Sequence, residues 1–308
     1  MGIMEALNEL ETIVLIVSAI VAAFFLFTWY RRILSAWPVN RGKSAKLVLG
    51  VLPVLVFFMI LYILETAASH DVVNDRYYIN FYLALGFAWL YLGVIVMSIF
   101  FNLSWVDDIL NMNNKAALFA FTGGFLGLTV IYAAANIGDG PGWGCVVFAG
   151  ALGLISWILL ALIMNLFTQA FERVTIERDV SCGIRLGSFL LAIGIILGRA
   201  SSGDWTSAYM TIVEFMVGWP AIPLTLMAII AELLFIINGK YNNTPVNNPS
   251  DSVFGAYPLP HNVITGGKNN ISGSDVDISI LVSSVLWGIT LIIIAVISIT
   301  ILPSMFGK

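Results

Sequence analysis

The sequence predicts an all-α membrane protein, a polytopic transmembrane helix bundle of about eight spans with a parallel tandem repeat of two-helix units. Composition is the first observation: 59% of the 308 residues are hydrophobic and only 10% are charged, whereas soluble domains carry about 25% charged residues. Apolar runs long enough to cross a bilayer recur along the chain. Two of these runs, around Gly123 and around Gly187, resemble each other, which indicates the repeat.

The first three spans are expected to form an N-terminal membrane segment, residues 1–106. The opening stretch MGIMEALNELET is acidic, and it lacks the positive charge of a cleavable signal peptide, so the first apolar run is interpreted as an uncleaved span. The second run contains Pro53, which we expect to kink it. The three spans are predicted at residues 13–30, 47–64 and 80–101.

Four further spans form the expected tandem-repeat core, residues 107–237. Residues 238–278 are rich in Asn, Gly, Ser and Pro and predict a flexible polar loop, and residues 279–308 hold a C-terminal transmembrane helix. Pro220 and Pro223 fall inside the long seventh span and are expected to kink or break it. These five spans are predicted at residues 116–137, 144–167, 182–200, 209–237 and 279–302.

Lysine and arginine are divided unequally between the two ends of the predicted spans. Eleven of the 14 fall at one end, and Arg76, Arg199 and Lys308 fall at the other. Positive charge marks the cytoplasmic side, so an even number of spans places both termini on the non-cytoplasmic side. Cys145 and Cys182 then lie near opposite faces, and we expect both to be packing residues rather than a disulfide.

The fourth and sixth spans carry the predicted repeat. MNNKAALFAFTGGFLGLTVIYAAANIGDGPGW begins at Met112, and IERDVSCGIRLGSFLLAIGIILGRASSGDW begins at Ile176. Each stretch opens on polar residues, continues through small residues and ends on a Gly/Asp turn followed by Trp. Gly123 aligns with Gly187 at an offset of 64 residues. Both copies enter the membrane from the same side, so the repeat is parallel rather than inverted.

These motifs resemble a known family. Asn-x-Ala-Ala before a glycine, in Asn114–Gly123, and a Gly-rich helix ending in Ala-x-x-Gly, in Ala200–Gly203, are similar to the YjfL-like tandem-repeat family of bacterial inner-membrane proteins, described by domain of unknown function 350. The resemblance runs from about Asp107 to Glu232, and in the second copy Cys182 and Gly183 replace the alanines. It implies a bacterial inner membrane, and it brings no known reaction, ligand or cofactor.

Glycines on these two spans predict close helix packing. Consecutive residues of a helix are about 100° apart around its axis, which places the glycines of the sixth span on one narrow face. Small residues on such a face let two helices approach closely. A permeation path lined by glycines is the alternative. The helix-packing residues are Gly183, Gly187, Gly194 and Gly198 on the sixth span, with Gly123 and Gly127 on the fourth.

Arg185 and Arg199 lie on the opposite face of the sixth span and need partners, because an unpaired charge in the membrane is costly. The seventh span offers Glu214 and Glu232, which are 18 residues apart and therefore point the same way. We expect two intramembrane ion pairs, Arg199 with Glu214 and Arg185 with Glu232. A structural role is favoured for both, and titration of Glu232 coupled to ion movement is the alternative.

Motifs of enzymes and cofactor sites are absent from the sequence. No GxSxG, HExxH, P-loop or GxGxxG pattern occurs. His70 and His261 both fall in loops, so a transmembrane haem has no ligands. His70 with Asp71, Asp75 and nearby Glu65 could hold a metal ion outside the membrane, against the plainer interpretation of a solvated loop. We expect no enzymatic activity, no cofactor and no metal.

The function expected from these features is that of a non-enzymatic multi-pass protein, a structural or assembly subunit of a membrane complex or a homo-oligomer. Its surroundings would be the lipid bilayer and membrane-protein partners. The net charge of −4 and the lack of a large basic patch exclude nucleic acid. The alternative is a channel or transporter for ions or small solutes that uses the kinked seventh span and Glu232. Parallel repeats and peripheral carboxylates disfavour an ion-coupled transporter.

Overall fold

Helices make up the regular structure of the computed structural model, which describes residues 2–36, 43–242 and 278–305. Within these ranges eight helical segments are long and apolar enough to cross a membrane, and no strand is formed. The predicted all-α bundle of eight spans is therefore confirmed.

The spans largely cover the predicted ranges, although α1 is longer than the predicted 13–30, and short helices connect several of them. In chain order the spans are α1 (Gly2–Ser35), α2 (Lys43–Thr66), α4 (Arg76–Phe100), α5 (Lys115–Ala135), α6 (Trp143–Thr168), α8 (Val180–Ser201), the pair α9 and α10 (Ala208–Phe215 and Ala221–Asn242) and α11 (Ile278–Met305). The short elements are α3 (His70–Val73), the π-helix η1 (Trp105–Asn111), α7 (Ala170–Thr175) and the 3₁₀ helix η2 (Met216–Gly218).

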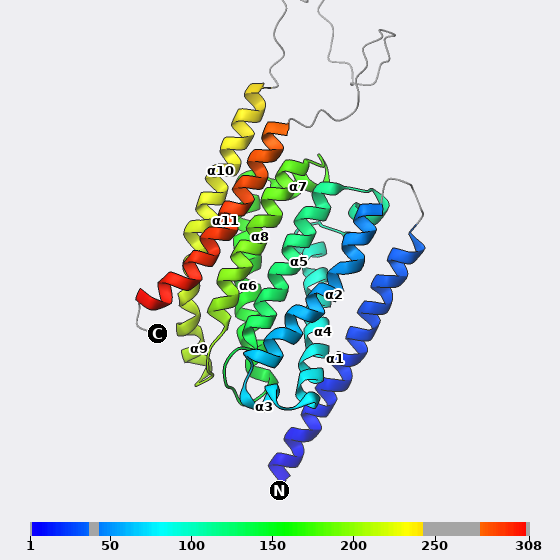
Figure 1. Ribbon diagram of the computed structural model, residues 1–308, viewed down its shortest axis with the longest axis vertical. Helices are drawn as coiled ribbons and strands as arrows, with labels where there is room; N and C mark the ends of the chain where they lie inside the picture. The colour runs from blue at the N-terminus through cyan, green and yellow to red at the C-terminus, as the bar shows by residue number, and fades with distance from the viewer. Residues whose placement is uncertain (1, 37–42, 243–277, 306–308) are drawn as a thin grey trace, which may run out of the picture.

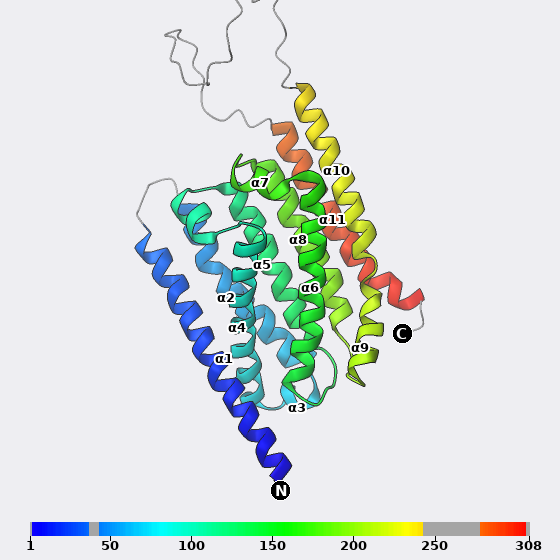
Figure 2. The same cartoon turned by 180° about the vertical axis from the view of Figure 1, so that it is seen from behind.

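The two ends of the bundle are marked by different short helices. Helices α3 and α9 lie at one end, called the α3 end, and α7 lies at the opposite end, called the α7 end (Figures 1 and 2). Helix α1 begins and helix α11 ends toward the α3 end (Figure 1). The two ends carry different chemistry.

Helices α5 and α8 form the centre of the bundle. In the most apolar 18-residue stretch of each of these two helices, 72% of the residues are buried, compared with 17% in α1 and 22% in α11. Helices α2 and α11 cover the centre in the view of Figure 1, and α4 and α6 cover it in the reverse view of Figure 2. The outer helices keep many large apolar side chains exposed, as expected for surfaces that face lipid.

The prolines in the second and seventh spans have different effects on their helices. The seventh span breaks before Pro220: helix α9 gives way to η2, and α10 begins at Ala221. Pro223 lies in the first turn of α10, where a missing N–H removes no intrahelical bond. Helix α2 continues through Pro53. The sequence predicts the polar loop at residues 238–278, of which the structure describes 238–242 and 278. Residues 238–242 belong to α10.

The same local features precede both central helices. A residue with positive φ lies shortly before each helix, Asn113 at 51° and Arg178 at 58°. The next residue caps the helix: Asn114 accepts from the N–H of Ala117, and Asp179 accepts from that of Cys182. A short helix, η1 or α7, comes before each pair. These features supply a common entry to α5 and α8, while the tandem repeat itself stays a prediction.

Candidate functional site

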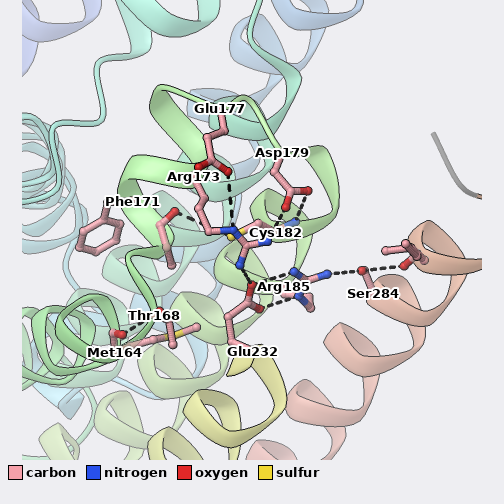
Figure 3. A network of polar contacts seen from close by, with 12 residues as sticks. Met164, Thr168, Phe171, Arg173, Glu177, Asp179, Cys182, Arg185, Glu232 and Ser284 are labelled. Carbon is pink, nitrogen blue, oxygen red and sulfur yellow. Dashed lines mark hydrogen bonds and ion pairs between the residues drawn. The ribbon is translucent and has the colours of Figure 1, made fainter. Parts of the chain in front are cut away.

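A network of charged side chains lies at the α7 end, around Glu232 of α10 (Figure 3). Arg185 of α8 donates to Glu232 through two nitrogens, Nε to Oε2 at 2.6 Å and Nη2 to Oε1 at 2.7 Å. Both side chains are buried, at 2% and 1% exposure. The structure thus brings together the predicted pair in the two-pronged geometry that suits guanidinium and carboxylate.

A second arginine, Arg173 of α7, binds the same carboxylate. Its Nη1 lies 2.5 Å from Oε1 of Glu232, and its Nη2 lies 2.5 Å from Oδ2 of Asp179. Asp179 uses its other oxygen to cap α8, accepting from the N–H of Cys182 at 3.0 Å. Arg173 therefore joins the start of α8 to α10, and Figure 3 shows both guanidiniums turned toward Glu232.

Arg185 also reaches the last span. Its Nη1 lies 2.5 Å from Oγ of Ser284 on α11, and its guanidinium carbon lies 4.2 Å from the ring centre of Phe235 on α10. Such a cation–π contact adds about 0.5–2 kcal/mol, more when desolvated. One side chain of α8 therefore holds both α10 and α11.

Opposite charges face each other throughout the network. Two arginines, Arg173 and Arg185, face two carboxylates, Glu232 and Asp179, and the exposed Glu177 lies 4.0 Å from Arg173. Burial lowers the pKa of Arg173, but the neighbouring Cys182, Glu232 and Asp179 outweigh it and raise that pKa above its ordinary value. A buried ion pair with such partners is costly to break, so the arrangement is suited to holding helices together.

The predicted glycine faces meet in the middle of the bundle. A Cβ added to Gly123 would stand 2.0 Å from the backbone oxygen of Gly187, and one added to Gly194 would stand 2.5 Å from the Cα of Gly127. Gly183 meets Ala116 in the same way, and Gly198 meets Val130 more loosely. Helices α5 and α8 are thus in backbone contact along their length, as small residues allow.

The other predicted sites lie at the α3 end. Arg199 donates to Oγ of Ser202 at 3.0 Å, and Glu214 lines a hollow beside α9; the pairing of these two charges stays a prediction. The alternative metal site is not formed. Throughout the part of the chain that the structure describes, no three His, Cys, Asp or Glu side chains converge as metal ligands.

Residues 70–201 match the family model described as Domain of Unknown Function (DUF350). The match identifies a DUF350 domain within this part of the chain. No curated protein and no solved structure matches the chain. The domain runs from α3 to the end of α8, so it begins and ends earlier than the range 107–232 of the resemblance. It includes the third span, which the resemblance left outside, and leaves out the seventh.

The charge network joins residues inside the DUF350 domain to residues that follow it in the chain. Arg173 and Arg185 belong to the DUF350 domain, whereas Glu232 and Ser284 belong to the helices that follow it. The network therefore fastens α10 and α11 onto the DUF350 domain. Because α10 and α11 contribute the carboxylate and the hydroxyl, their attachment depends on specific polar contacts as well as on apolar packing.

Sequence reasoning missed Arg173, Ser284 and Phe235. Arg173 lies 59 residues from Glu232 on a six-residue helix, and the start of that helix depends on Gln169, whose φ is 51°. No periodicity in so short a helix reveals which way a side chain points. Ser284 is one of several hydroxyl residues on α11, and only the packing of α8 against α11 selects it.

Proposed function

We propose that the chain is a non-enzymatic structural or assembly subunit of a bacterial inner-membrane complex or homo-oligomer. The observation that carries the proposal is the state of Glu232. Its side chain is 1% exposed and accepts hydrogen bonds from two arginines. A carboxylate held in this way stabilises helix packing and is poorly placed to exchange protons or ions with water.

The centre of the bundle supports the same proposal. Backbone contact between α5 and α8 at Gly123 and Gly187 leaves no space for a solute between them. The outer helices α1 and α11 are the least buried spans, and they offer apolar surface to lipid or to neighbouring membrane proteins. We further propose that the α7 end faces the cytoplasm and that both termini lie on the other side, following the distribution of Lys and Arg.

Reconstitution tests the proposal directly. The full chain in sealed vesicles should show no flux of protons, potassium ions or small solutes above that of empty vesicles. Gentle purification with crosslinking should recover a homo-oligomer or a constant set of membrane partners. Flux through the wild-type protein that a folded Glu232→Gln variant abolishes would overturn the proposal, as would turnover of any substrate.

A channel or transporter is the second candidate. One observation favours it: the seventh span is broken between Phe215 and Ala221, and broken helices are common in transporters. The break between α9 and α10 lies toward the α3 end (Figure 1), whereas Glu232 binds Arg173 of α7, at the opposite end. Flux that persists in Glu232→Gln but is lost when Gly218 is replaced would favour this candidate and place the path at the break.

A further inference from the structure

Helix α10 is fixed to the rest of the bundle by different kinds of contact at its two ends. At its start the chain turns through η2 and Pro220, so no continuous helix joins α10 to α9. Gly218 in η2 packs closely on α8, because an added Cβ would stand 2.9 Å from the Cβ of Ala200. Hinges in proteins occur at a few residues of this kind, where one element ends and the next begins. The start of α10 is therefore a pivot held by close packing.

The far end of α10 depends on the charge network. Glu232 is 1% exposed, and it is the last buried side chain of α10 among those that the structure describes, which run to Ile237. Its partners Arg173 and Arg185 belong to α7 and α8, and the ring of Phe235 lies against the same Arg185. Beyond this point α10 and α11 extend past α7 (Figure 1). Two arginines of the DUF350 domain therefore hold the far end of α10.

Helix α11 depends on this network much less. An added Cβ at Gly288 would stand 2.3 Å from Oγ of Ser188, so α11 and α8 are in close contact. Leu291 and Ala295 continue the buried face of α11, at 1% and 0% exposure. Loss of the hydrogen bond from Arg185 to Ser284 would leave this packing in place. We therefore expect α11 to stay on α8 if α10 moves.

The charged contact is strong only while it excludes water. Removing one partner of a buried pair is strongly destabilising, because the other charge is left buried without hydration. When both partners move into water together, hydration offsets much of the lost attraction, and an exposed ion pair contributes little. Water is close to this contact, since Arg173 is 16% exposed and Asp179 is 30% exposed. Opening at this end therefore costs less than the loss of either charge.

We propose that α10 is a strap that opens at the α7 end by turning about the pivot at Gly218. The contact of Glu232 with Arg173 and Arg185 is its catch, and the structure shows the catch closed. In the open state the carboxylate and both guanidiniums are hydrated, while α9 and α11 keep their places. The strap is independent of the proposed assembly function, because it opens within a single chain.

Cys182 is a native reporter of the catch. Its side chain is 0% exposed, its Sγ lies 3.8 Å from the backbone oxygen of Ala170, and it lies beside Arg173 in the network (Figure 3). Opening turns the guanidiniums toward water and lets a small thiol reagent reach the sulfur. In purified full-length protein that carries Cys145→Ser, the rate at which a small maleimide labels Cys182 therefore measures how often the strap opens.

Two variants of the catch should change this rate in opposite ways. Glu232→Gln leaves the guanidiniums without their carboxylate and should raise the labelling rate at least about tenfold. Arg185→Met combined with Glu232→Leu replaces the buried pair by apolar side chains, which usually leaves such a contact as stable as before or more stable. Arg173 keeps Asp179 as its partner in this double variant. The double variant should therefore react no faster than wild type.

Gly86→Ala is the control for general loss of stability. An added Cβ at Gly86 would stand 2.6 Å from Cε1 of Tyr132, away from the catch, so the bundle is strained and the labelling rate of Cys182 should stay unchanged. An unchanged rate in Glu232→Gln overturns the proposal, as does a double variant that reacts as fast as Glu232→Gln. An equal rise in Gly86→Ala also overturns it, because Cys182 would then report unfolding of the whole bundle. Failure to find an oligomer or partners would overturn the assembly function and leave the strap standing.

Discussion

Replacing Gly123 with alanine is expected to destabilise the bundle by about 2 kcal/mol. The new Cβ would stand 2.0, 2.4 and 2.6 Å from the oxygen, carbonyl carbon and Cα of Gly187. The closest of these distances is about 1.4 Å short of ordinary contact. All three atoms are backbone, so no side chain can rotate away, and α5 and α8 must separate around the site.

The magnitude follows from two opposing terms. Overpacking a close-packed interior costs about 1–3 kcal/mol, more when the backbone must move. Alanine in place of glycine in a helix contributes about 1 kcal/mol in the other direction. Because the overlap is severe and involves rigid backbone atoms, we expect an overpacking cost at the upper end of the range of about 1–3 kcal/mol. This cost exceeds the gain of about 1 kcal/mol in helix propensity. The separation would also loosen the neighbouring contact of Gly187 with Phe119.

Unfolding of the full chain by SDS in mixed micelles measures this free energy. Gly50→Ala is the matched control: Gly50 lies inside α2, and an added Cβ meets nothing within 4 Å. Gly50→Ala should leave the protein as stable as wild type or more stable by up to about 1 kcal/mol. The reasoning is refuted if Gly123→Ala is as stable as wild type, or if both substitutions change the stability by the same amount.

Two further predictions concern polar contacts, and a third concerns the orientation in the membrane. Glu232→Gln should cost about 3–5 kcal/mol, because it leaves the buried Arg185 and the partly buried Arg173 without their shared carboxylate. Glu177 is 67% exposed and lies 4.0 Å from Arg173, so Glu177→Gln should change stability by less than about 0.5 kcal/mol. Equal losses in the same SDS titration would contradict this. Asn114→Ala should cost about 1–3 kcal/mol, because this buried side chain caps α5 and donates to the backbone oxygen of Val174 at 2.8 Å; the melting temperature of the purified protein measures the loss, and an unchanged value would count against it. An impermeant thiol reagent should label the partly exposed Cys145 in intact cells more readily than in inverted vesicles, and should spare Cys182 in both; the reverse order for Cys145 would overturn the proposed orientation.

The spacing of residues along a helix was sufficient to predict the pairing of Arg185 with Glu232. Helical geometry places Glu214 and Glu232 on one face of the seventh span, and the hairpin places Glu232 near the end where Arg185 enters. That reasoning needs only the span boundaries, which hydrophobicity predicts well. It does not reveal Arg173, because the direction of a side chain on a six-residue helix depends on the turns around it.

Two adjoining hollows at the α3 end mark the opposite limit. Their lining comes from seven helices and the loops between them, and their six carboxylates are scattered from Glu11 to Glu214. In the sequence Tyr82 is one aromatic residue among many in a membrane span. Only the packing of α4 beside α6 and the Gly140–Gly142 loop shows that Tyr82 lies where the two hollows meet.

Length, composition and hydrophobic runs alone determined that this chain is a membrane bundle of eight spans, since the ability of a helix to cross a bilayer is a local property of about 20 residues. The glycine spacing likewise predicted which faces approach closely. Only the tertiary structure decided that Arg173 also binds Glu232 and that Ser284 binds Arg185, since these contacts join residues 59 and 99 positions apart. Such contacts depend on how the helices rotate and tilt against one another, and no repeat or period along the chain encodes that.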